Sequence, residues 1–165
     1  MAILKNYPLP TMEAFTKLLA DLLGKKVAST VIPPLTLTKD TQITATFLNE
    51  KQEIVSIAAC DLKLGASAAA VLTMVPAGMA KEAVKAGALS DNLMENLQEI
   101  FNISSTLLNA EGAPRVVLGT VIPASAPMPP EVTEMITKPA ARLDLEIEVP
   151  GYDKGKWVFM SKAIN

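Results

Sequence analysis

The chain has 165 residues, of which 50% are hydrophobic, a formal net charge of -2 and no histidine. Without histidine, hydrolases that use an imidazole base are excluded, and so are the usual zinc sites. The small negative charge and the presence of only two arginines, Arg115 and Arg142, argue against binding to nucleic acid, which needs a basic surface.

The same composition indicates one domain, spanning residues 1–165, in the cytoplasm. No apolar run reaches the roughly eighteen residues of a transmembrane helix, and the first residues lack the features of a signal peptide. The single cysteine, Cys60, follows two alanines, which favours an inert buried thiol over a nucleophile.

The first third of the chain predicts one helix followed by strands. The helix begins after Thr11, a suitable cap, and ends at Gly24, with apolar residues at helical spacing between them. A short β-branched segment follows at 27–32. The alternating segment 43–47 predicts a half-buried strand, and 54–59 predicts a strand that is apolar on both faces.

The middle third is mainly helical, with one ambiguous segment. The alanines of 67–75 favour a helix, but its valines after a glycine turn favour a hairpin partner, and we assign a strand there. A helix from Pro76 to Ala86 has proline at its start and Gly87 just past its end, the usual asymmetry. The next helix, capped by Ser90, runs to about Asn109.

The last third predicts a strand, a loop and a hairpin. The strand covers 115–122, and the loop 123–130 is too rich in proline to be regular, so we interpret it as a connector and not as a recognition segment. In 142–149 apolar and charged residues alternate, so one face packs and the other meets water or a partner. Its charged positions are Arg142, Asp144, Glu146 and Glu148. Trp157 and Phe159 continue the packed side on the returning strand.

Together these elements predict one α+β domain: a largely antiparallel sheet of hairpins with helices packed on one face. No internal repeat, linker or second domain is evident. Whether the strand 142–149 pairs between subunits stays open at this level.

The helix predicted over 91–109 carries a polar stripe without lysine. Its members are Asn92, Glu95, Glu99, Asn102, Thr106 and Asn109, at steps of three and four residues. At about 100° per residue these six side chains fall within an arc of about 100°, and the apolar residues turn mostly the other way. Carboxylates and carboxamides are short groups suited to contact at close range.

Several interpretations of this stripe compete. Glu95 and Glu99, four residues apart, could bind a metal ion if other elements supply further ligands. They could also be a glycosidase acid and base, although one helix face places them side by side and not across a cleft. The stripe could equally be a solvated helix face, or a face that packs against a second copy of the chain.

The segment Glu99-Ile100-Phe101-Asn102 resembles the CheC, CheX and FliY phosphatases of bacterial chemotaxis. Their signature is an acidic residue or serine, three residues, Glu, two residues and Asn on a helix, with a later proline. Glu95, Glu99, Asn102 and Pro123 hold these places. The resemblance covers residues 41–122, and its single motif is most similar to CheX.

This resemblance implies a CheX-like fold and hydrolysis of the aspartyl phosphate on a response-regulator receiver domain such as CheY. Asn102 would orient the attacking water without bringing negative charge toward the phosphate, and Glu99 would dock on the receiver's lysine. Glu95, Asn92 and Thr106 would contribute to partner binding. The receiver would supply a divalent metal ion, so no cofactor of the chain's own is implied.

The chain departs from the family at three positions. Glu95 stands where the family has aspartate or serine, Thr106 where CheX-like members tend to have glycine, and the bulky Phe101 directly precedes the asparagine. The alternative function is therefore a non-catalytic CheX-like module that binds a receiver domain or a flagellar motor component through the same stripe. Family members occur as monomers and as dimers, so a homodimer is also open.

Overall fold

The computed structural model describes residues 4–38 and 42–164. The expectations for residues 1–3, at the start of the chain, and for Thr41, at the start of the family resemblance, lie outside the described residues. The helices are α1 (Met12–Leu23), α2 (Leu62–Leu72), α3 (Ala77–Ala86), α4 (Asp91–Ser104), the 3₁₀ helix η1 (Ser105–Leu108) and α5 (Pro130–Thr137). The strands are β1 (Ala28–Val31), β2 (Gln42–Leu48), β3 (Ile54–Asp61), β4 (Val117–Ile122), β5 (Ala141–Glu148) and β6 (Gly155–Ser161).

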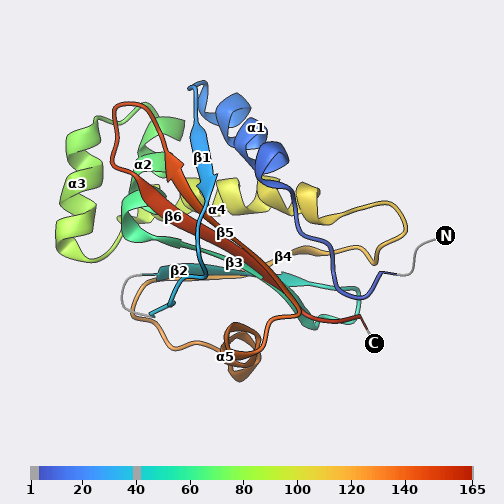
Figure 1. Cartoon of the computed structure of the whole chain (residues 1–165). Coiled ribbons are helices and arrows are strands. Elements are labelled where there is room, and N and C mark those ends of the chain that lie inside the picture. The colour runs from blue at the N-terminus through green and yellow to red at the C-terminus, as the bar shows by residue number, and fades with distance from the viewer. Residues whose placement is uncertain (1–3, 39–41, 165) are drawn as a thin grey trace.

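The six strands form one antiparallel sheet in the order β1-β5-β6-β3-β2-β4 (Figure 1). The predicted α+β class and antiparallel sheet are confirmed. Strand β5 lies between β1 and β6, with Leu145 opposite Val31 on one side and opposite Trp157 on the other. One edge of β5 is therefore paired with β6, and residues 145–148 of the other edge are paired with β1.

The strand order contains a two-fold repeat that the sequence does not reveal. From one edge inward the strands are β1, β5 and β6, and from the other edge they are β4, β2 and β3. Exchanging the unit α1-β1-β2-β3 with the unit α4-β4-β5-β6 converts one order into the other. In this topology α1 and α4 occupy equivalent places, and α2 and α3 lie between the two units.

The sheet is covered on both faces. Helices α1, α2 and α4 lie on one face, with α3 packed against α2, as predicted for helices on one face (Figure 1). Helix α5, which the sequence did not indicate, lies on the other face against β3 and β6. The reason is that these central strands are apolar on both sides: Ile57, Ala59, Val158 and Met160 form a second buried cluster with Val132 and Met135 of α5.

The strand predicted at 67–75 is wrong, because these residues belong mainly to helix α2. Asp61 caps this helix, and its Oδ1 accepts a hydrogen bond from the backbone N–H of Leu64 at 2.9 Å. Gly65, interpreted as a turn, lies inside the helix. A Cβ there would come within 3.1 Å of Leu97 Cδ2, so the glycine allows α4 to approach α2 closely. Helix propensity and close packing outweigh the local valines.

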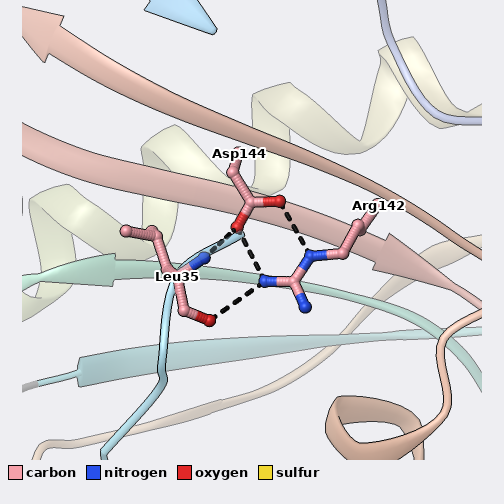
Figure 2. A network of polar contacts seen from close by, with 3 residues as sticks. All are labelled: Leu35, Arg142 and Asp144. Carbon is pink, nitrogen blue, oxygen red and sulfur yellow. Dashed lines mark hydrogen bonds and ion pairs between the residues drawn. The ribbon is translucent and has the colours of Figure 1, made fainter. Parts of the chain in front are cut away.

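On the charged face of β5, Glu148 is exposed as predicted, whereas Asp144 meets neither water nor a partner. Asp144 is only 4% exposed. Arg142 donates from Nε to Asp144 Oδ1 at 2.8 Å and from Nη2 to Oδ2 at 2.7 Å, and the backbone N–H of Leu35 donates to Oδ2 at 2.9 Å (Figure 2). Arg142 Nη2 also donates to the Leu35 carbonyl at 3.1 Å. Arg142 and Asp144 thus form a bidentate ion pair on β5, and the segment between β1 and β2 covers it through the backbone of Leu35.

Candidate functional site

Helix α4 carries the predicted stripe and is held by its opposite face. Ser90 caps it as predicted, since its Oγ accepts a hydrogen bond from the Leu93 N–H at 3.3 Å. The inward residues are Leu93, Leu97, Ile100, Phe101 and Ser104, all buried. They place the helix against α2 and β4. The regular helix ends earlier than predicted, at Ser104, and continues as η1.

Phe101 packs the inner face of this helix against the core directly beneath the stripe. It is fully buried, and its ring centroid lies 4.9 Å from that of Trp157 on β6. The side chain next in sequence, Asn102, is exposed. The bulky residue before the asparagine therefore points into the core and leaves the outer surface to Asn102, so this departure from the family pattern does not obstruct the site.

Four members of the stripe are exposed and unengaged. Asn92, Glu95, Glu99 and Asn102 are exposed, and none of their side chains forms a hydrogen bond or ion pair with another residue that the structure describes. We call these four residues the free stripe. Their carboxylate and carboxamide groups keep their full capacity to bind an external group.

The other two members are committed to their own chain. Asn109 donates from Nδ2 to the carbonyls of Ser105 and Val116, both at 3.0 Å, and its Oδ1 accepts from the Val116 N–H at 2.9 Å. It thereby ties η1 to the segment that leads into β4. Thr106 is exposed, but its hydroxyl donates to the Ile103 carbonyl at 2.8 Å. Of the predicted partner-binding residues, Asn92 and Glu95 lie with Glu99 and Asn102, and Thr106 lies beyond them.

The geometry gives little support to a small-substrate site at the stripe. Glu95 and Glu99 lie side by side on an exposed helix surface, not across a cleft. Three open grooves of about 640 to 660 Å³ lie elsewhere, and no stripe residue lines them. Among residues 4–38 and 42–164, no group of three or more acidic or cysteine side chains could hold a metal ion. The exposed face suits a macromolecular partner.

Two further sequence predictions can be compared with the structure. Cys60 is fully buried, and burial raises the pKa of its thiol well above the ordinary value, as expected for an inert cysteine. Pro123, the proline of the family pattern, is exposed and directly follows β4. The loop after it is irregular as predicted, up to the start of α5 at Pro130.

The structure adds a neighbour to the stripe that helical spacing could not indicate. Asn96 of α4 donates from Nδ2 to Thr73 Oγ1, at the end of α2, at 3.3 Å. The next residue, Met74, is 94% exposed. Because Thr73 and Asn96 are 23 positions apart, only the packing of α2 on α4 brings them together.

This arrangement of sheet and helices is the fold seen in CheX and FliY. No family model and no curated protein matches the sequence. Among solved structures, CheX in the CheX-CheY-BeF3-Mg complex from Borrelia burgdorferi has a TM-score of 0.52 and 18% identity, covering 91% of this chain and 93% of that one. FliY from Thermotoga maritima has a TM-score of 0.57 and 15% identity, covering 93% and 84%.

The FliM middle domain has the same fold. The H. pylori domain superposes with a TM-score of 0.62 at 10% identity, covering 91% of this chain and 84% of that one. At such identities the likeness is one of fold. Helices described in residues 4–38 and 42–164 are all too short or too polar to cross a membrane.

Proposed function

We propose that this protein accelerates hydrolysis of the aspartyl phosphate on a receiver domain, as CheX-like phosphatases do. One observation carries the proposal: Glu99 and Asn102 lie one helical turn apart, exposed and unengaged, on a helix whose inner face is fixed by Phe101 on Trp157. A rigid helix presents both groups without prior rearrangement. The shared fold with a CheX crystallised with CheY supports the same proposal.

The residue types fit this chemistry. An acyl phosphate is already reactive, so the main task is to hold a water molecule in line with phosphorus. The Asn102 carboxamide can do so without adding negative charge near the phosphate oxygens. Glu99 would pair with the receiver's lysine, and Glu95 and Asn92 would extend the contact along α4. The receiver would supply the divalent metal ion, and the reaction would take place in the cytoplasm with the receiver.

The backbone around Asn102 is also held in place. Its carbonyl accepts a hydrogen bond from Ser105 Oγ at 2.6 Å, and Ser104 Oγ donates to the Ile100 carbonyl at 2.7 Å. These contacts lie at the junction of α4 and η1, so the asparagine does not sit on a frayed helix end. Positional accuracy matters because a displacement of about 1 Å can lower a rate by about 100-fold.

The test is a phosphate-release time course on phosphorylated receivers from the same cell, with wild-type protein and with Asn102→Ala. We expect the variant to lose about 100-fold of the stimulated rate, with a change of at most about 0.5 kcal/mol in the free energy of unfolding. Gln98→Ala, an exposed carboxamide of α4 outside the stripe, is the matched control and should keep the rate. Full activity in Asn102→Ala would overturn the assignment.

A second candidate function is a non-catalytic module that binds a receiver or a motor component through the same free stripe. One observation favours it: FliM middle domains superpose with higher TM-scores, 0.65 in a FliM-SpeE complex and 0.61 in a FliG-FliM complex, than the 0.52 of CheX. The discriminating result is binding of a receiver loaded with beryllium fluoride and Mg²⁺ without faster phosphate loss from the phosphorylated form.

A further inference from the structure

The turn between α2 and α3 contains Met74, whose exposure and backbone conformation are both unfavourable for methionine. Met74 is 94% exposed, whereas the other exposed large apolar side chains of the described residues range from 38% to 58%. Its backbone φ is +59°, in the left-handed region that favours glycine. Neither packing within the chain nor local conformation favours methionine here. Sites where local preferences are overridden are often functional.

The turn itself is rigid. The N–H of Val75 donates to the Ala70 carbonyl at 2.8 Å, and that of Met74 donates to the Val71 carbonyl at 3.1 Å. This pair of bonds is the Schellman arrangement that ends a helix. From the other side, Tyr152 Oη donates to the Val75 carbonyl at 3.0 Å. The backbone is therefore fixed while the Met74 side chain extends into solvent.

The same turn is attached to the border of the free stripe. Thr73 Oγ1 accepts the hydrogen bond from Asn96 described above. At about 100° per residue, Asn96 lies about 40° around the α4 axis from Asn92, a member of the free stripe. Met74, next to Thr73, thus lies at the Asn92 edge of the free stripe, on the side away from Asn102.

We propose that Met74 is the apolar anchor of the interface whose polar part is the free stripe, and that it fills an apolar recess on the receiver domain. The inference rests on the proposed function. The free stripe contains only polar side chains, and exposed ion pairs contribute little binding energy, whereas interfaces depend on a few buried apolar anchors. Methionine is unbranched and polarisable, so it adapts to a recess of irregular shape.

Met74→Gly tests this anchor without disturbing the fold, because glycine suits the positive φ and should keep or raise stability. The probe is a receiver loaded with beryllium fluoride and Mg²⁺ for affinity, and the phosphorylated receiver for kinetics. We expect about tenfold weaker binding and a KM about tenfold higher, the usual effect of truncating an anchor, with kcat within about twofold. Met74→Leu should restore most of the affinity.

Val31→Thr is the matched control, because Val31 is an exposed apolar residue on the edge strand β1. It should leave affinity and KM unchanged. If Met74→Gly leaves both unchanged while Asn102→Ala abolishes stimulated release, the anchor is refuted and the proposed function stands. A fall in kcat at constant KM also refutes it. If wild-type protein neither binds nor stimulates any receiver, both proposals fall.

Discussion

Helices α1 and α4 occupy equivalent places in the two halves of the chain, and their inner faces are alike. Each begins at a hydroxyl cap, Thr11 for α1 and Ser90 for α4. Each places a phenylalanine on the same indole: the ring centroids of Phe15 and Phe101 lie 4.8 and 4.9 Å from that of Trp157. Both helices therefore pack on the sheet in the same way, with a phenylalanine against Trp157.

The outer faces of the two helices differ. The exposed residues of α1 include Glu13, Lys17 and Asp21, a mixture of charges common on solvated helices. The outer face of α4 has carboxylates and carboxamides and no cation. Residues of the inner face must pack on the core, whereas residues of the outer face can differ without loss of packing. The fold alone therefore does not define the proposed site, which lies on only one of two equivalent helices.

The largest expected effects concern the shared inner face. Phe101→Ala and Phe15→Ala should each lower the free energy of unfolding by about 3–5 kcal/mol, because each removes a fully buried ring next to Trp157. Chemical denaturation of the two variants measures this. If one variant costs much less than the other, the two helices are not equivalent in the core.

The next effect separates structural from functional members of the stripe. Asn109→Ala should lower the free energy of unfolding by about 1–3 kcal/mol, because the Val116 N–H and two carbonyls lose their partner. Stimulated phosphate release per folded molecule should not change. If the folded variant loses activity, Asn109 also takes part in the proposed site.

The smallest energetic effect concerns the outer faces. Glu99→Lys should weaken binding to the receiver by about tenfold or more, equal to about 1.4 kcal/mol, because it sets a cation against the receiver's lysine. The opposite charge change on the equivalent helix α1, Lys17→Glu, should leave the affinity for the receiver within about twofold. Each of the two variants should change the free energy of unfolding by at most about 0.5 kcal/mol. Affinity titrations compare them, and similar losses from both variants would contradict a site confined to α4.

Local patterns in the sequence predicted the elements whose signals are local. The cap at Ser90 and the spacing of the stripe were enough to predict α4 and the shared face of Glu99 and Asn102. Alternation was enough to predict β2 and β5 as strands, but the half-buried β2 expected from it is wrong, because Thr44 and Thr46 are buried as well. The strand assigned at 67–75 was wrong because Gly65 does not mark a turn. It allows close packing against Leu97, far along the chain.

Features that depend on distant contacts could not be predicted. The burial of Asp144 requires Leu35, from the segment between β1 and β2, to meet it on the sheet face. The two-fold repeat is evident in the order of the strands in the sheet and not in the residues that make up the two halves. The place of Met74 beside α4 depends on a hydrogen bond between two helices. Each of these arises from packing, which periodicity does not record.

Trp157, which contacts Phe15 of α1 and Phe101 of α4, can serve as an intrinsic fluorescence probe. It is the only tryptophan of the chain, it is fully buried, and its Nε1–H has no hydrogen-bond partner among the residues that the structure describes. An indole in such apolar surroundings emits at short wavelength, and a shift of the Phe101 ring beside it would change that emission. Intrinsic fluorescence would therefore report, without any label, whether docking on the outer face of α4 displaces the Phe101 ring beneath it.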